Sequence, residues 1–467
     1  MSKQLKRLVP IFALAAALIP ALAQTNDELN AKIMALSELD HKIAADPNLL
    51  PRAKAGDATA QVLVGGLYET GMTFPRDLAK AADWYGKAAA QGDAEAEFKL
   101  GCLYYGGRGV PKDNVKAAVW YRKAAEQGHA QAQLFLGESY VHGEGVPKNN
   151  VLAANWIRKA ADQDDAGGQF DLGLLYERGQ GVPKDSAQAV VWYRKAAVKG
   201  RLDAQTALAQ LFYFGRGVPQ DYDQAAIWYQ KAAAQGDAGA QLKLAFMYED
   251  GHGVPQDEVQ ATAWFRKAAE QDDSGAEYLL GRRYEVGQGV KQDYGQAAAW
   301  YRKAADQANG SAQYALAFLY EQGQGVPQDN AQAVYWYRKV ADQGDAGGQF
   351  SLGSCYELGL GVPQDYAQAA AWYQKAADQG FAYAQHSLGL LYKEGHGVPQ
   401  SYADAYFWLN IAAADSKGTD QEEIATQRDA AAAKLTSIDL SKAQRRAAAW
   451  FALHQQKERT GQVKEEQ

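Results

Sequence analysis

The sequence predicts an all-α fold, an α-solenoid of about ten helix-loop-helix repeats. Ten tryptophans indicate it, because each follows the one before by 36 residues, without an insertion or deletion. A Gly-Val-Pro motif recurs with the same period. A period of roughly 20 to 50 residues is typical of stacked units that cannot bury their apolar faces alone. The ten tryptophans are Trp84, Trp120, Trp156, Trp192, Trp228, Trp264, Trp300, Trp336, Trp372 and Trp408.

Composition bounds the class of protein further. The chain of 467 residues has 47% hydrophobic and 11% aromatic residues, which is ample for a continuous core and excludes a disordered chain. Its net charge of −7 argues against general nucleic-acid binding, which requires a basic face. No cofactor motif is present.

Residues 1–23 are predicted to be a signal peptide. A basic start precedes an apolar run over residues 8–19, and Ala21-Leu22-Ala23 forms a small-x-small cleavage site. The run of 12 residues is shorter than the roughly 20 that a membrane helix needs, so we expect no membrane span. We expect cleavage between Ala23 and Gln24 and an exported protein, soluble and either periplasmic or secreted.

Residues 24–55 are predicted to form an N-terminal capping helix. Leu29, Ile33, Leu36 and Ile43 give it an apolar face, and prolines follow it. Terminal units of a solenoid are atypical because one of their sides must face water.

Ten repeats are predicted over residues 56–415. In one of them, Ala96, Leu100 and Tyr104 recur at i, i+4 and i+8, the spacing of one helical face. Glycines and Pro111 then end this first helix. An N-cap residue, which satisfies orphan helix N–H groups for about 1 kcal/mol, begins the second helix. The ten N-cap residues are Asp77, Asp113, Asn149, Asp185, Asp221, Asp257, Asp293, Asp329, Asp365 and Ser401.

The tryptophan of each second helix is expected to fill the gap between units. A ligand-stacking platform is the other interpretation, but identical repetition at ten positions favours a structural role. Glutamates that follow the first-helix tyrosine and lysines three residues after the tryptophan form two further ladders, expected to make inter-repeat or surface ion pairs. Examples are Glu177, Glu249, Glu285, Glu321, Glu357, Lys123, Lys159, Lys195 and Lys231.

Residues 416–467 are predicted to be a C-terminal helical cap and tail. Two helices are expected, over residues 424–435 and 440–454, and the second of them carries Trp450. The last dozen residues, rich in Lys, Glu and Gln, are expected to fray.

The repeat pattern ALGxxYExGxGVPxDxxxAxxWYRKAAxxG resembles the Sel-1-like repeat, a relative of the tetratricopeptide repeat, over residues 56–415. The tail also resembles the C-terminal capping segment of bacterial members. The resemblance implies a right-handed α-solenoid superhelix that works by protein–protein interaction, as an adaptor or assembly scaffold. It also implies that the first helix of each repeat lines the concave surface.

Some secreted members of that family carry a disulfide in each repeat and are linked to penicillin-like compounds. This chain departs from that branch, since its two cysteines, Cys102 and Cys355, lie seven repeats apart. Elements so far apart in a solenoid do not bring their Cα atoms within the ~7 Å that a bridge requires. We therefore expect no disulfide between them.

No catalytic, cofactor-binding or metal site is predicted. The acylating Ser-x-x-Lys pattern and the zinc-binding His-Glu-x-x-His pattern are both absent. The seven histidines show no metal-ligand spacing, and the Gly-rich loops lack the Lys-Ser/Thr ending of a phosphate-binding loop.

The leading hypothesis is a non-enzymatic scaffold that binds one or more proteins on its concave face. One alternative is a regulator or enzyme acting on the cell wall, and another is a secreted factor that engages host or neighbouring cells. An export signal alone does not separate these.

One repeat breaks the pattern and indicates where a partner binds. Arg282 and Arg283 stand where other repeats have apolar residues, and Lys291 replaces the loop proline. These three cations are expected to converge on one unit of an acidic protein, on the helix predicted to face inward. Arginine suits bidentate capture of carboxylate or phosphate groups. The other interpretation is that Arg282 pairs with Glu285 three residues on.

Overall fold

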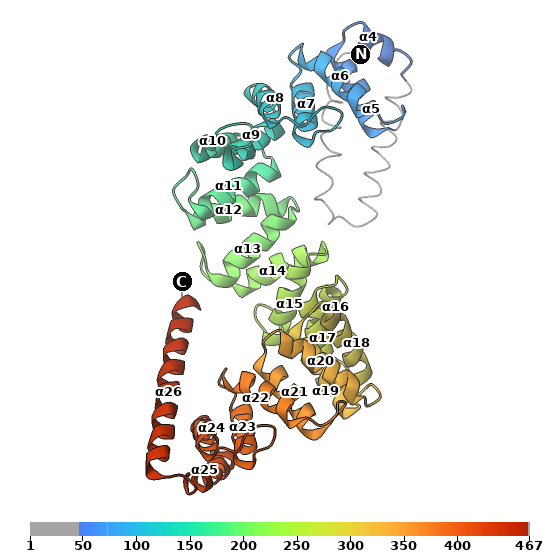
Figure 1. Cartoon of the computed structure of the whole chain (residues 1–467). Coiled ribbons are helices and arrows are strands. Elements are labelled where there is room, and N and C mark those ends of the chain that lie inside the picture. Colours follow the sequence, from blue (N-terminus) through green and yellow to red (C-terminus); the bar gives the residue numbers. More distant parts are fainter. Residues whose placement is uncertain (1–45, 72, 466–467) are drawn as a thin grey trace. The chain divides into compact units, whose positions relative to one another are not determined.

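The computed structural model describes residues 46–71 and 73–465, and within them it is all-helical, with 23 α-helices and no strand (Figure 1). The predicted signal peptide and the four apolar residues of the predicted N-terminal cap lie outside the described residues. The fold is an α-solenoid of ten helical pairs.

The first helix of each pair spans 13 residues, and a Gly-containing loop joins it to the second. In chain order the pairs are α5 (Ala58–Thr70) and α6 (Leu78–Ala89), α7 (Ala94–Gly106) and α8 (Asn114–Glu126), α9 (Ala130–His142) and α10 (Asn150–Asp162), α11 (Ala166–Arg178) and α12 (Ser186–Val198), α13 (Leu202–Phe214) and α14 (Tyr222–Ala234), α15 (Ala238–Asp250) and α16 (Glu258–Ala269), α17 (Ser274–Val286) and α18 (Tyr294–Asp306), α19 (Gly310–Gln322) and α20 (Asn330–Asp342), α21 (Ala346–Leu358) and α22 (Tyr366–Ala377), and α23 (Ala382–Glu394) and α24 (Tyr402–Asp415).

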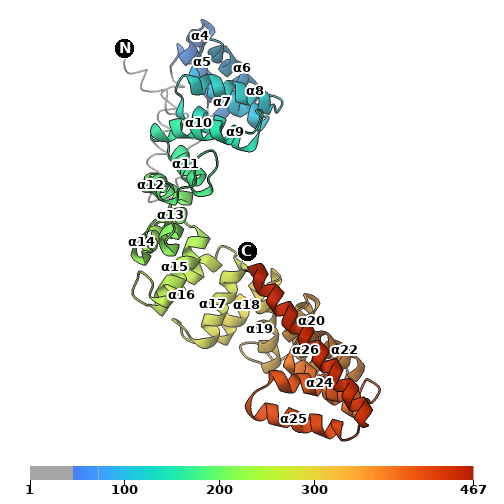
Figure 2. The same ribbon diagram turned by 90° about the vertical axis from the view of Figure 1, so that its left-hand side faces the viewer.

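The chain divides into two compact units, one ending at Asp257 and the other beginning at Glu258. Within each unit a helix packs mainly against the helix before it and the helix after it, as α18 does against α17 and α19. Figure 2 shows this succession of neighbours in a second view. Nearest-neighbour packing of this kind is the defining property of a solenoid.

The ring at the centre of most repeats is a tyrosine, and not the tryptophan that precedes it. Seven of the ten repeat tryptophans are only partly buried. The residue after the tryptophan is fully enclosed, as Tyr193 and Tyr301 show at 0% exposure. A Cβ added at Gly173 of the first helix would lie 2.7 Å from the Tyr193 ring, so the small residue makes room for it. The sequence prediction that the tryptophan fills the gap between repeats is therefore correct in part: Trp228, Trp336 and Trp408 are buried, whereas partly buried tryptophans such as Trp120 and Trp156 pack against the edge of a core cluster that includes the preceding repeat.

The predicted N-caps are confirmed at nine of the ten second helices, where the side-chain oxygen accepts a backbone N–H. The loops also require glycine. Gly109 has a φ of 73°, and a Cβ there would lie 2.2 Å from the carbonyl carbon of Leu78 in the preceding repeat. The loop of one repeat therefore packs directly on the second helix of the repeat before it.

The two charged ladders differ from the prediction. Four of the glutamates accept a hydrogen bond from the buried tyrosine of their own repeat, as Glu285 does from Tyr301 at 2.5 Å. In nine repeats the lysine lies over the tryptophan ring, with its Nζ 3.6 to 4.6 Å from the ring centroid. Both ladders therefore act within one repeat. The lysines make cation–π contacts, and Lys87 also makes the predicted surface ion pair, with Asp83 at 2.8 Å.

A buried glutamine ladder links successive repeats. The Gln313 amide donates to the carbonyl of Ala305 at 3.0 Å and its oxygen accepts from Gln343 at 2.9 Å. Equivalent pairs join residues 30 apart in six other repeats. Because the first-helix member of each pair, such as Gln313 at 2% exposure, is shielded from water, leaving it without its partner would be costly.

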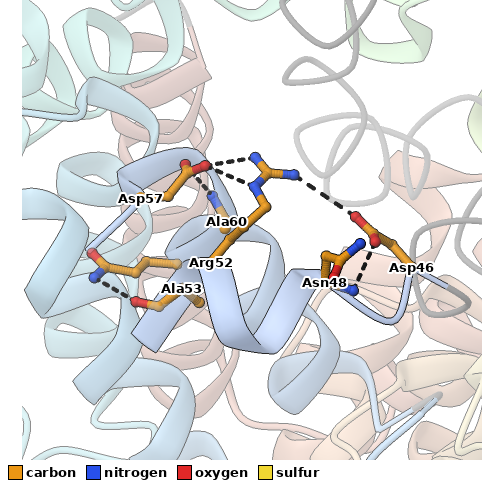
Figure 3. A network of polar contacts seen from close by, with 7 residues as sticks. Asp46, Asn48, Arg52, Ala53, Asp57 and Ala60 are labelled. Atoms are coloured by element: carbon orange, nitrogen blue, oxygen red, sulfur yellow. Dashed lines mark hydrogen bonds and ion pairs between the residues drawn. The ribbon is translucent and has the colours of Figure 1, made fainter. Parts of the chain in front are cut away.

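Short elements close both ends of the described chain. At the N-terminal end, α4 (Leu49–Lys54) is tied to α5 by Arg52, whose guanidinium contacts Asp57 at 2.6 Å and Asp46 at 3.7 Å (Figure 3). At the C-terminal end, α25 (Gly418–Ala432) and α26 (Ser437–Glu465) both pack against α24. The second predicted tail helix is thus longer than expected, since α26 continues beyond His454.

Candidate partner-binding face

The first helices present one face to solvent. In α19, Ala312, Leu316 and Leu319 are buried at 0% exposure, whereas Tyr314 and Phe318 are 38% and 41% exposed. Two large apolar rings thus lie open on the surface of one helix. We call the solvent-facing side of helices α5, α7, α9, α11, α13, α15, α17, α19, α21 and α23 the first-helix face.

The side chains on this face differ from repeat to repeat, whereas the buried ones repeat. The buried position of Leu316 carries leucine in nine repeats and valine in the first. The outward position of Phe318 carries apolar, polar, acidic and basic residues in turn, namely Gly66, Cys102, Glu138, Leu174, Gln210, Phe246, Arg282, Phe318, Ser354 and Leu390. Packing fixes the first set. It constrains the second set less, since Gln210, Phe246, Arg282 and Phe318 are exposed and most of the others are only partly buried.

In the second unit this face contains a groove with a volume of about 810 Å³. It is lined by the rings of Tyr278, Tyr314 and Phe381 and by small residues such as Ser311 and Gly347. A Cβ added at Gly347 would lie 3.7 Å from the Tyr314 ring, so the ring lies across the start of the next first helix. The rings continue beyond the groove, because Phe350 lies 5.4 Å from Phe381 and 6.1 Å from Tyr383 between ring centroids.

The sequence analysis did not identify this groove. Its signal is nevertheless in the sequence, as an aromatic residue at the fifth position of the first helix in five repeats. Only three of these belong to the second unit, Tyr278, Tyr314 and Phe350.

The structure separates the three cations of the seventh repeat. Arg282 and Lys291 are exposed. Arg283 is only 4% exposed, its guanidinium donates to Glu258 at 2.7 Å, and it lies 4.6 Å from the centroid of the Phe265 ring. Arg283 therefore holds α17 to α16 and does not present its charge with the other two on one surface.

In the first unit, two carboxyl groups face each other on the first-helix face. Burial, together with the neighbouring Asp171, raises the pKa of Glu138 to about 8. Burial also raises the pKa of Asp171, against the opposing effect of Arg201. One proton shared between such carboxyl groups relieves the repulsion between them.

The described part of the chain has three further features, which concern metals, membranes and thiols. No group of three or more His, Cys, Asp or Glu residues there is arranged to hold a metal ion. None of the described helices is both long and apolar enough to cross a membrane. Cys102 and Cys355 are free thiols, and burial raises the pKa of Cys102 to about 11.

These features define a helical repeat protein whose variable surface lies on one set of helices. Comparison with known proteins agrees with this class. Ten segments between residues 58 and 416 match the Sel1 repeat, at 58–93, 94–129, 130–165, 166–200, 202–237, 238–273, 274–309, 310–345, 346–381 and 382–416. The chain therefore belongs to the Sel1 repeat family, whose members generally act as protein-interaction scaffolds and are typically non-catalytic.

Two solved structures are similar over much of their length. One is a protective antigen of uropathogenic Escherichia coli strains with an SLR fold, which is 36% identical, with a TM-score of 0.61, over 87% of this chain and 94% of that one. The other is a Sel1 repeat protein from Oxalobacter formigenes, which is 38% identical, with a TM-score of 0.52, over 66% of this chain and 89% of that one. No curated protein matches the chain.

Proposed function

We propose that this chain is an exported, non-enzymatic scaffold that binds partner proteins on its first-helix face, which the family resemblance places on the concave side of the solenoid. The observation that carries the proposal is the contrast between fixed and variable positions within one first helix. Leu316 and its equivalents are fixed by packing, whereas Phe318 and its equivalents change chemistry at nearly every repeat.

The second helices support the same choice of face. Part of their surface is uniform, because the tryptophan and the lysine that covers it recur in nine repeats and the tryptophan is partly exposed in seven of these, whereas the exposed residue before the tryptophan varies, as Asp83, Val119 and Tyr335 show. A uniform surface offers a partner little by which to distinguish one repeat from another. A face with different side chains in each repeat lets a partner distinguish one repeat from the next, because specificity depends on differences between contacts.

Site-specific photocrosslinking in the source organism tests which face binds. A photoreactive phenylalanine analogue replaces Phe318 on the first-helix face in one variant, and Tyr335 on second helix α20 in the other. The two positions are a matched pair, since both are aromatic and they are 41% and 50% exposed. Crosslinked products are identified by mass spectrometry.

We expect a discrete protein adduct from position 318 and none from position 335. Adducts only from position 335 would place binding on the second helices and refute the proposed face. The absence of any protein adduct from a series of first-helix positions, including 246 and 390, would refute the scaffold function itself.

Arg282 and Lys291 remain part of the proposed surface, and Arg283 acts by holding it in place. Changing Arg282 and Lys291 together to glutamine is expected to reduce partner retention without changing the melting temperature, since both side chains are exposed. Unchanged retention would remove these two residues from the binding surface.

Export is proposed from residues 1–23 and tested separately. We expect the mature protein to begin at Gln24 and to be released by osmotic shock. N-terminal sequencing that recovers Met1 on the released protein would contradict this. A charged residue in place of Ala23 is expected to block processing.

A further inference from the structure

We infer that the groove between α17, α19 and α21 binds a short basic segment of a partner protein, one that carries lysine or arginine beside apolar residues. This inference rests on the proposed function and specifies the chemistry of the partner at one place on the first-helix face. It depends on two independent features of the groove, its open aromatic rings and the sign of the charge along its rim.

The rings provide the first feature. Tyr278, Tyr314 and Phe381 line the groove, and Tyr314 is 38% exposed. An aromatic face attracts a cation that lies within about 6 Å of the ring centroid, and it also contacts apolar side chains. The chain uses this contact repeatedly within itself, for example where Lys339 lies 4.7 Å from the centroid of Tyr335.

The rim provides the second feature. Three turns between successive repeats border the groove, at residues 306–311, 342–347 and 378–383, and the groove is lined by residues of all three. These turns contain four aspartates and no lysine or arginine, and the four are Asp306, Asp342, Asp345 and Asp378. Acidic turns without lysine or arginine recur in most repeats, as at 162–167 and 270–275, and turn 198–203, with Lys199 and Arg201, is the exception. What distinguishes the three turns of the second unit is that they border a groove lined by aromatic rings.

Within the part of the chain that the structure describes, no lysine or arginine forms an ion pair with these four aspartates. The lysines of the adjoining second helices lie elsewhere, since Lys303 and Lys375 are 4.2 Å and 3.6 Å from the ring centroids of Trp300 and Trp372. The groove therefore offers aromatic rings beside carboxylates that no described lysine or arginine pairs with, Asp345 within the groove and the other three in the turns that border it. Complementary charge is what selects a partner at such a surface.

Ser311 allows the charge to be tested at a single position. It lies in the groove and is exposed, so larger side chains fit there without disturbing the core. Ser311→Arg and Ser311→Glu introduce similar volumes with opposite charges. A basic segment should be repelled by the arginine and attracted by the glutamate, whereas a purely steric effect would be the same in both.

The probe is a phage-displayed library of random dodecapeptides, selected on the immobilised full-length protein. The most enriched peptide is then labelled, and its Kd is measured by fluorescence anisotropy against the parent protein, both Ser311 variants and the triple variant Asp306→Asn, Asp342→Asn, Asp378→Asn. Circular dichroism checks that each variant keeps its fold. Asp345 is left unchanged because it caps α21.

We expect selected peptides rich in lysine or arginine, at least tenfold weaker binding to Ser311→Arg and to the triple variant, and undiminished binding to Ser311→Glu. The inference is overturned if no peptide is enriched, if the enriched peptides lack basic residues, or if both Ser311 variants bind equally. Such a result leaves the proposed function standing when Phe318 still crosslinks to a partner. Crosslinks confined to position 335 would refute the proposed function separately.

Discussion

The guanidinium of Arg283 donates to the carboxylate of Glu258 across 2.7 Å and joins α17 to α16. The same nitrogen lies 3.3 Å from the hydroxyl of Thr262, and Gln288 donates to the other oxygen of Glu258 at 3.0 Å. In the next repeat the position of Arg283 carries Leu319, which is fully buried. One interface of the second unit therefore uses a polar network where the neighbouring repeat uses apolar contact.

Removing one partner of this pair is expected to be costly. Arg283→Gln leaves Glu258 without its guanidinium, and breaking a buried pair costs about 3–5 kcal/mol. Because the Glu258 side chain is 34% exposed, water solvates its carboxylate in the variant and offsets part of this cost. We therefore expect the free energy of unfolding to fall by about 2 kcal/mol. Thermal unfolding followed by circular dichroism measures it. The exposed Arg282→Gln is the control, with an expected change within about 0.5 kcal/mol. Equal effects of the two variants would contradict the assignment of Arg283 to the core.

The buried tyrosines supply a second prediction with a control inside the chain. Tyr301→Phe removes the hydrogen bond to Glu285 and is expected to cost about 1 kcal/mol. Tyr229 occupies the same position in the fifth repeat, but its buried hydroxyl has no partner, because Tyr213 stands where Glu285 does. Tyr229→Phe is therefore expected to leave stability unchanged or to raise it. Phe265 already occupies this position in the sixth repeat.

Equilibrium unfolding of both variants and the parent measures the difference. A larger loss for Tyr229→Phe than for Tyr301→Phe would show that the hydroxyl of Tyr229 is satisfied in solution and that the tyrosine–glutamate bond contributes little.

The repeat architecture was predictable because period and capping are local signals. The interval between tryptophans gives the repeat length, and an aspartate such as Asp113 before a helix shows where that helix begins. Which ring fills the core was not predictable in this way. Trp300 and Tyr301 are adjacent and both aromatic, and only the packing of α17 against α18 decides that the tyrosine points inward.

At the candidate site, too, the sequence did not predict which of two adjacent side chains is buried. Arg282 and Arg283 are neighbours in sequence, and the pattern predicted one shared surface for both. A helix turns about 100° per residue, so consecutive side chains point in different directions. Arg283 takes the place of a core leucine, while Arg282 is exposed. The groove at Tyr314 also escaped prediction, because it is formed by residues from three repeats.

The carboxyl pair of the first unit predicts a pH dependence. Burial raises the pKa of Glu138 from 4.5 to about 8 in the folded protein. The folded state therefore holds more protons than the unfolded state between these two values, and the free energy of unfolding falls as pH rises through that window. Below pH 4.5 the protonated Glu138 carboxyl makes its full favourable contribution to the free energy of unfolding.

Glu138→Gln removes this titration, so we expect a flatter dependence of melting temperature on pH and a more stable protein at pH 8. The exposed Glu126→Gln is the control and should retain the slope of the parent. A Glu138→Gln variant with the parent's slope would show that the carboxyl pair does not hold an extra proton.

The last prediction concerns how far a defect spreads. Trp228 is 7% exposed, and its replacement by alanine is expected to cost about 3 kcal/mol, as for other buried aromatic side chains. Because each repeat contacts only its neighbours, amides of α13, α14 and α15 should lose protection from hydrogen exchange first. Those of α5 and α6, several repeats away, should keep the parent's protection. The control is Trp192→Ala, where the ring is only partly buried and a smaller loss is expected. Hydrogen exchange with mass spectrometry resolves these segments, and a uniform loss of protection throughout the first unit would contradict the nearest-neighbour description of the fold.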